Sequence, residues 1–370
     1  MPRLSPNHLL HAHRLHAHLP ALLRACRDLP SAQNELRWLR EHAGADSERL
    51  RALVRRRAKG VPLQYVLGSE FFGDLEIVCK PGVLIPRQDT AAAITHLASL
   101  LLQYSKRLPP NLRVLDLCTG TGCIPLLAEH LLHPAVPDPH FLGVDVSLRC
   151  LQLAQLNASR CRAQRTRFLR ADVLASNDAS NAGPIEPLLP LLHRAGTPTW
   201  DVLISNPPYI SPRHFVRTTA RSVRNWEPKL ALVPRSATGS AGEDADTAVA
   251  NDDAVADTFY PALLRAADGV GAKVALFEVA DLEQGMRVAG MVKRGGGWDG
   301  VEVWRDEPGV GNMQGSGHEQ GVWRVEGGGT EGEEAKEVEE EAEGARVRGR
   351  GEGRSVVCWR GEGGRWLGQG

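Results

Sequence analysis

Short apolar runs alternate with longer segments of helical periodicity along most of the chain. A run rich in Val, Leu and Ile that ends in polar residues or Gly predicts a buried strand. Strands that alternate with helices predict an α/β fold, with a mostly parallel sheet and helices on both faces. The predicted strands are 113–118, 141–146, 166–172, 200–206, 272–280 and 299–306, with 354–360 as a seventh and 321–325 as an alternative last strand.

The N-terminal part has a different pattern. Residues 31–60 carry leucines at helical spacings among charges, and Gly60 is a plausible stop. We therefore predict a helical domain over 29–83, which ends in the start of a hairpin around the Lys80–Gly82 turn. Residues 1–28 begin with an acid-free segment that combines Arg and His with leucines, as a mitochondrial presequence does. The same residues also suit the first helix of the N-terminal domain.

The C-terminal part divides into three segments. The α/β domain is expected over 84–309, and 354–370 holds the last strand and a tail. Between them, residues 310–353 are rich in Gly, Glu and Arg and have few large apolar residues. Such a segment cannot bury enough surface to offset the entropy of ordering, so we predict a disordered insertion.

Composition narrows the classes of partner. Lys and Arg together number 44, equal to Asp and Glu, so no overall field favours nucleic acid or a membrane. No apolar run approaches the ~20 residues that span a bilayer. The seven cysteines are scattered without a Cys-x-x-Cys pair, which predicts neither a zinc site nor a disulfide framework and favours a reducing compartment.

A glycine-rich turn, "DLCTGTGC", follows the strand at 113–118 and precedes a predicted helix. Gly120 and Gly122 lack Cβ atoms, so their backbone can approach a ligand closely, and the helix start offers free N–H groups. The third Gly of a dinucleotide fingerprint is missing. The turn therefore suits an adenosine ligand without a pyrophosphate better than NAD.

Two acids stand at the ends of the next two strands. Asp145 is placed to accept both hydroxyls of a ribose, and Asp172 is placed to accept an adenine amino group. Taken alone, each acid is more often a helix cap. The glycine turn, the two acids and an Asn-Pro-Pro-Tyr turn stand in this order at four successive strand ends, and together they predict an S-adenosylmethionine site beside a substrate site.

The fourth strand runs directly into Asn206-Pro207-Pro208-Tyr209. Proline cannot continue a sheet, so the prolines end the strand and stiffen the turn. The Asn206 side-chain oxygen and the Pro207 carbonyl can each accept one N–H bond from a planar nitrogen, and Tyr209 offers a ring against which a planar group packs. The turn therefore predicts methylation of an amide or of an exocyclic base amine.

Several segments resemble the HemK/PrmC family of class I S-adenosylmethionine-dependent methyltransferases. They are "RRRAKGVPLQYVLGSEFFG", "VLIPRQDT", "LQLAQLNA", "VRNWEPKLAL", "FEVADLEQG" and "VEVWRDEPG". The resemblance implies a Rossmann-like domain with a seven-stranded, mostly parallel sheet behind a small helical substrate-recognition domain. It also implies methylation of the glutamine in the Gly-Gly-Gln motif of a class I peptide chain release factor, giving N5-methylglutamine. The long inserts and the N-terminal composition favour a eukaryotic mitochondrial form, whose partner would be a mitochondrial release factor; otherwise a cytoplasmic form is expected.

The resemblance also assigns residues. Asn206 to Tyr209 would grip the glutamine amide, with Asn206 also beside the cofactor, and Arg87 would lie at the substrate entrance or brace the domain junction. Two positions depart from the family pattern: Cys118 replaces a usual Gly, and Ala91 stands where many members carry Glu. The cofactor residues implied are Cys118, Thr119, Gly120, Thr121, Gly122, Asp145, Asp172 and Val173.

Two other functions remain open at this point. A nucleic-acid N6-adenine methyltransferase uses the same Asn-Pro-Pro-Tyr turn, but it would need a basic, aromatic-bearing surface. Here aromatic residues make up 5% of the chain and Arg55–Arg57 form a lone basic run. An inactive homologue that acts as a binding protein would explain Cys118, Ala91 and the low-complexity tail, but not the retention of the whole cofactor and substrate pattern.

Overall fold

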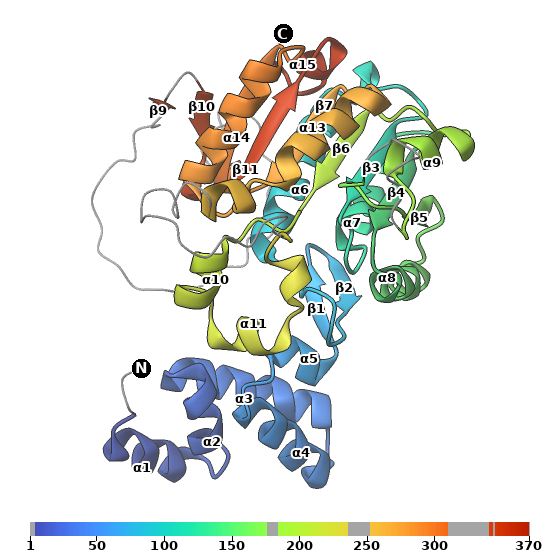
Figure 1. The fold of residues 1–370 in the computed structure, drawn as a ribbon. Helices are drawn as coiled ribbons and strands as arrows, with labels where there is room; N and C mark the ends of the chain where they lie inside the picture. Colours follow the sequence, from blue (N-terminus) through green and yellow to red (C-terminus); the bar gives the residue numbers. More distant parts are fainter. Residues whose placement is uncertain (1–3, 176–183, 236–251, 310–339, 343–344, 370) are drawn as a thin grey trace.

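A nine-stranded sheet forms the centre of the computed structural model, which describes residues 4–175, 184–235, 252–309, 340–342 and 345–369 (Figure 1). The strand order is β5-β4-β3-β6-β7-β11-β8-β10-β9. The strands are β3 (Arg113–Leu117), β4 (His140–Asp145), β5 (Thr166–Arg170), β6 (Val202–Ser205), β7 (Val274–Glu278), β8 (Gly300–Glu307), β9 (Glu340–Ala342), β10 (Ala345–Arg348) and β11 (Arg350–Trp359). Strands β3 to β7 are mutually parallel, while β11 runs antiparallel between β7 and β8.

Both faces of the sheet are buried, which explains the near-continuous apolar strands. In β3, Val114 packs in one core, and Leu115 and Leu117 pack in the other. Helices α6 and α7 contribute to the first core, and α13 and α14 contribute to the second. The helices of this domain are α6 (Gln88–Gln103), η1 (Ser105–Arg107), α7 (Cys123–Leu132), α8 (Leu148–Arg160), α9 (Leu188–Arg194), α10 (Pro212–Arg217), α11 (Arg221–Trp226), η3 (Lys229–Ala231), α13 (Phe259–Val270), α14 (Leu282–Gly295) and α15 (Glu362–Trp366).

The sheet extends beyond the seven predicted strands. Strand β10 pairs parallel with β8, β9 pairs with β10, and β11 begins at Arg350 rather than at 354. The predicted insertion over 310–353 was therefore wrong for residues 340–342, which form β9, and for 345–353, where buried Ala345 and Val347 supply an apolar face that the surrounding charged composition concealed. The remainder of that prediction, 310–339 and 343–344, and the alternative strand at 321–325 lie outside the described residues.

Five helices form the N-terminal domain from residue 4 on, where its description begins, and this domain lies beside the sheet domain in Figure 1. They are α1 (Pro6–Leu15), α2 (Leu19–Cys26), α3 (Leu29–Ala43), α4 (Ser47–Ala58) and α5 (Leu63–Leu67). Leu19, Leu22 and Leu23 of α2 are buried against α3 and α4. The described part of the segment predicted as a presequence, from residue 4 on, therefore forms the first two helices of this domain and shares its core. The domain does not begin at residue 29, as predicted. Cleavage after import stays a prediction.

The linking hairpin turns earlier than predicted. Strands β1 (Ser69–Phe72) and β2 (Leu75–Val78) are joined by Gly73-Asp74, not by Lys80–Gly82. Gly73 has φ +56°, which suits the first position of a two-residue hairpin turn. The Lys80–Gly82 turn follows β2, where the Val83 N–H donates to the Lys80 carbonyl at 3.2 Å, and leads the chain toward α6.

Within the described residues, no helix combines the length and apolar character needed to cross a bilayer.

Replacing Val347 tests whether β10 belongs to the folded sheet. Its side chain is 2% exposed, so we expect Val347→Asp to lower the free energy of unfolding by about 3 kcal/mol through burial of an unpaired carboxylate. Urea unfolding followed by circular dichroism measures this change. Arg350, which is exposed at the start of β11, gives the control, Arg350→Ser, for which a change within about 0.5 kcal/mol is expected. Equal, small effects of both substitutions would contradict the burial of β10.

Candidate active site

A cavity of about 480 Å³ opens at the carboxyl ends of the parallel strands. The chain passes from β3 to β4 on one side of β3 and later returns to β6 on its other side, so the loops part there, as they do at the ligand sites of open α/β sheets. The predicted residues that line the cavity are Arg87, Cys118, Thr119, Gly120, Thr121, Asp145, Asp172, Val173, Asn206 and Pro208. Gly122, Pro207 and Tyr209 are not among its lining residues.

The two glycines of the turn after β3 serve different purposes. A Cβ atom at Gly120 would meet nothing within 4 Å, so this residue faces open space at the cavity. A Cβ atom at Gly122 would lie 2.9 Å from Ala154 and 3.0 Å from the Phe168 ring. Gly120 therefore leaves room for a ligand, while Gly122 is required by the packing of the turn against α8 and β5.

Cys118 occupies a backbone conformation that favours glycine. Its φ is +64°, in the left-handed region that costs an L residue roughly 1 kcal/mol. The next residue is held by a hydrogen bond from the Thr119 N–H to the Val144 carbonyl at 2.9 Å, which fixes the turn. This conformation gives a physical reason for the glycine that the family resemblance places here.

Asp145 fixes the glycine turn as well as lining the cavity. Its Oδ2 accepts from the Gly120 N–H at 2.9 Å, and its Oδ1 accepts from the Ser147 N–H at 2.8 Å. Burial raises the pKa of this carboxyl, and the two backbone bonds oppose the rise. At the end of the next strand, Asp172 accepts from the Leu174 N–H at 2.8 Å. Both acids thus stand at strand ends, as predicted.

The amide of Asn206 has a defined orientation. Its Nδ2 donates to the Thr90 hydroxyl at 3.2 Å, and the Thr90 hydroxyl in turn donates to the carboxylate of Glu278. A carboxylate only accepts, so the Thr90 proton is committed to Glu278 and the Thr90 oxygen is left to accept from an N–H. The Asn206 side-chain nitrogen is therefore the atom that faces Thr90, and the side-chain oxygen remains available to accept from another group.

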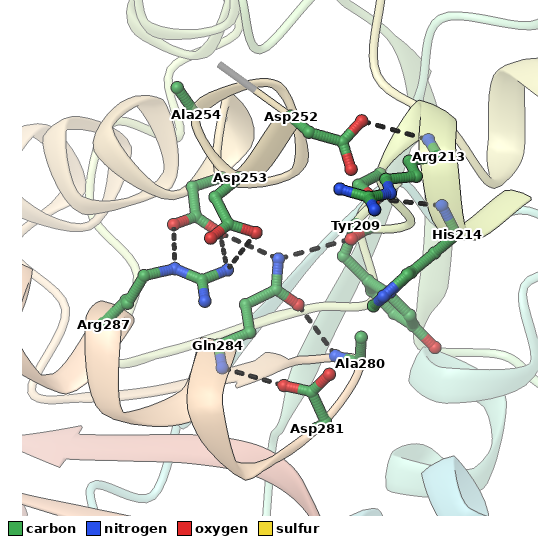
Figure 2. A network of polar contacts seen from close by, with 12 residues as sticks. Tyr209, Arg213, His214, Asp252, Asp253, Ala254, Ala280, Asp281, Gln284 and Arg287 are labelled. Carbon is green, nitrogen blue, oxygen red and sulfur yellow. Dashed lines mark hydrogen bonds and ion pairs between the residues drawn. The ribbon is translucent and has the colours of Figure 1, made fainter. Parts of the chain in front are cut away.

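Tyr209 is held at both of its polar ends. Its hydroxyl donates to Glu278 Oε1 at 3.0 Å, and its carbonyl accepts from Gln284 Nε2 at 3.3 Å (Figure 2). Gln284 also donates to Asp257, which pairs with Arg287. The turn after β6 is thus braced from the sheet side and from α14.

Glu278 is buried at the end of β7. Desolvation raises its pKa to about 7, although the hydrogen bonds from Thr90 and Tyr209 lower it. This carboxyl lies directly behind the cavity, since its partner Thr90 lines it.

Arg87 pairs with a buried carboxylate beside the segment that links the two domains, and both of its predicted roles stay predictions. Its guanidinium contacts Glu227 Oε1 at 2.9 Å and Oε2 at 3.0 Å. The Glu227 carboxylate is buried and also accepts from the Ile85 N–H at 3.1 Å. Arg87 lines the cavity too, so the junction and the cavity share this side chain.

Sequence reasoning missed Thr90, Glu227 and Glu278. All three lie in segments that carry the family resemblance, "IPRQDT", "NWEPKLAL" and "FEVADLEQG". Glu278 also ends a parallel strand, which is the signal that identified Asp145 and Asp172. Among the described residues, no group of three or more His, Cys, Asp and Glu side chains is placed to hold a metal ion.

The strand order, with one antiparallel strand inserted between β7 and β8, and the cavity at the strand ends define a class I methyltransferase fold. A putative class I S-adenosylmethionine-dependent methyltransferase from Listeria monocytogenes overlaps with a TM-score of 0.36 at 15% identity, covering 81% of this chain and 83% of that one.

Sequence comparison identifies the family. Residues 20–68 match the PrmC N-terminal domain. The chain is 38% identical over 235 residues to the mitochondrial MRF1 N(5)-glutamine methyltransferase MTQ1 of Saccharomyces cerevisiae, covering 63% of this chain and 68% of that protein. It is 40% identical over 185 residues to the protein of Schizosaccharomyces pombe named "Probable MRF1 mitochondrial N(5)-glutamine methyltransferase mtq1", covering 49% of this chain and 54% of that protein. It is 37% identical over 183 residues to the release factor glutamine methyltransferase of Geobacter sulfurreducens, covering 49% of this chain and 53% of that protein. The chain therefore belongs to the family of release factor glutamine methyltransferases, and it spans about half the length of the latter two relatives.

Removing the Glu227 carboxylate tests the domain junction. Glu227→Ala leaves Arg87 and the Ile85 N–H without their partner, so we expect the free energy of unfolding to fall by about 2 kcal/mol, less than for a fully buried pair because Arg87 is partly exposed. Urea unfolding gives the value. The exposed Glu186–Arg194 pair supplies the control, since Glu186→Ala should cost under about 1 kcal/mol. A loss at Glu227 no larger than the control would contradict a bracing role.

Proposed function

We propose that the protein transfers the methyl group of S-adenosylmethionine to the glutamine side-chain amide in the Gly-Gly-Gln motif of a class I peptide chain release factor. The observation that carries this proposal is the oriented Asn206 amide, whose oxygen remains an acceptor in the same cavity as the glycine turn. Membership of the release factor glutamine methyltransferase family supports the glutamine over an adenine amine, so we do not propose the N6-adenine alternative.

The cavity residues fit the proposed cofactor. When bound, S-adenosylmethionine would supply an electrophilic methyl group on a sulfonium. Gly120 would leave space for its methionine part, together with Cys118, Thr119 and Thr121 of the same turn. Asp145 would accept from the ribose hydroxyls with the lone pairs that the Gly120 and Ser147 N–H groups leave free. Asp172 and Val173 would contact the adenine.

The proposed role of Asn206 follows from the electronic structure of an amide. A glutamine nitrogen is a poor nucleophile because its lone pair is delocalised into the carbonyl. Acceptance of its two N–H bonds, by the Asn206 side-chain oxygen and the Pro207 carbonyl, would aim the nitrogen and stabilise the positive charge that grows as it attacks. The methyl group that the cofactor would supply would replace one proton of the glutamine nitrogen, and that proton would leave to water.

A mitochondrial release factor is the proposed partner, and the mitochondrion is the proposed location. The support comes from two fungal relatives whose names place them there and refer to MRF1. The helical N-terminal domain is proposed to recognise this partner, since its match to the PrmC N-terminal domain links it to the same family.

Mass spectrometry of a co-expressed mitochondrial release factor tests the reaction. The wild-type protein should add one methyl group to the Gly-Gly-Gln glutamine. Asn206→Ala should lower this methylation by at least about 100-fold, because it removes an acceptor used in the transition state. Asn111→Ala, at an exposed position before β3, is the matched control and should leave methylation unchanged. No added methyl with the wild-type protein would contradict the proposed substrate.

Binding calorimetry tests the proposed cofactor site. Asp145→Ala should weaken S-adenosylmethionine binding by roughly 1–3 kcal/mol, because ribose hydroxyls would lose their acceptor. Asp145 also holds the glycine turn, so its melting temperature is measured in parallel. Ser147→Gly keeps the backbone N–H that donates to Asp145, so it serves as a comparison for effects that come from disturbing this loop alone. An unchanged dissociation constant in Asp145→Ala would contradict the ribose role.

A further inference from the structure

Three side chains from distant parts of the chain form a continuous hydrogen-bonded row behind the cavity. Glu278 ends β7, Thr90 lies in the first turn of α6, and Asn206 follows β6. Glu278 and Thr90 are buried, with exposed fractions of 4% each, while Asn206 reaches the cavity. The row therefore connects Glu278, which does not line the cavity, with Asn206, which is proposed to hold the substrate nitrogen.

We infer that Glu278, acting through Thr90, is a positioning residue that keeps the Asn206 amide oxygen directed at the substrate nitrogen. This inference rests on the proposed function. Neither Glu278 nor Thr90 is proposed to touch the reacting atoms.

The direction of the row follows from donor counting. Thr90 has one hydroxyl proton, and it is given to the Glu278 carboxylate. The Thr90 oxygen then accepts from Asn206 Nδ2 at 3.2 Å. A flipped Asn206 amide would set its oxygen against the Thr90 oxygen, two acceptors without a proton between them. The ionised carboxylate therefore selects one of the two amide orientations, although it never contacts Asn206.

Protonation of Glu278 would remove this selection. A neutral carboxyl can donate to Thr90, whose own proton is then free to point to Asn206. The flipped amide would present N–H groups to the substrate N–H groups, which cannot bond. Since burial raises the pKa of Glu278 to about 7, the active orientation would be favoured above this pH and lost as the pH falls through it. The ionisable groups that face Glu278 are Arg87 and Asp89 before and within α6, Cys123 of α7, Tyr209 after β6, and Tyr260 of α13.

Single-turnover methylation of the release factor by Thr90 variants gives the test. Thr90→Val keeps the shape of the side chain and removes its hydroxyl, so Asn206 loses its fixed orientation. The rate at saturating substrates should therefore fall by about 10- to 100-fold. The dissociation constant for S-adenosylmethionine should stay the same. Thr90→Ser retains a hydroxyl and should restore most of the rate. Glu278→Gln cannot titrate, so the inflection near pH 7 in the wild-type rate profile should disappear.

The chain offers a matched control for structural damage. Thr166 of β5 donates to the buried carboxylate of Glu129 at 2.6 Å, away from the cavity. Thr166→Val thus removes the same kind of buried contact, and it should lower the melting temperature about as much as Thr90→Val does while leaving the rate and its pH profile unchanged.

The outcomes separate this inference from the proposed function. Wild-type methylation together with a normal rate and pH profile in Thr90→Val would overturn the inference and leave the function standing. Absence of wild-type methylation would overturn the proposed function. In that case, hydrogen exchange of the Asn206 side-chain amide, followed by NMR, tests the hydrogen-bonded row independently of activity. Faster exchange in Thr90→Val than in the wild-type protein is expected, and equal rates would overturn the inference.

Discussion

One buried carboxylate, that of Glu278, determines how the elements around the cavity must meet. It accepts from the hydroxyl of Thr90, 188 residues away along the chain, and from that of Tyr209, 69 residues away. A buried carboxylate without such partners would cost several kcal/mol. The two bonds therefore hold the start of α6 and the turn after β6 against the end of β7, and Asn206 lies at the cavity in this arrangement.

The turn after β6 is held by contacts that the protein itself supplies. Pro207 and Pro208 restrict its backbone from within, while Glu278 and Gln284 hold the two polar ends of Tyr209 from opposite sides. A turn fixed in this way loses little conformational freedom when a substrate binds. Preorganised acceptors are also what a reaction limited by the poor nucleophilicity of an amide nitrogen requires.

The sequence allowed the strands, the glycine turn and the strand-end acids to be predicted because each has a local signal. The apolar residues Val114, Leu115 and Leu117 of β3 form such a signal, because both faces of the sheet are buried. The turn of the first hairpin was misplaced because Lys80–Gly82 and Gly73-Asp74 both carry turn residues, and only pairing between strands decides between them. Glu278 carries the local signal of a strand end, but its hydrogen bond to Thr90 spans 188 residues and no local pattern records it. Glu227 was missed because its partner Arg87 lies 140 residues away.

The segment from Val83 to Thr90 connects the N-terminal helices to the cavity at several points within a few residues. The Val83 carbonyl accepts from the Tyr65 hydroxyl at 2.6 Å, Ile85 packs in the N-terminal core, and Arg87 pairs with Glu227. Three residues later, Thr90 meets Glu278. A connection held this closely sets the N-terminal domain at a fixed place relative to Asn206. Such geometry suits a substrate large enough to contact both places at once, which a folded protein is and a free amide is not.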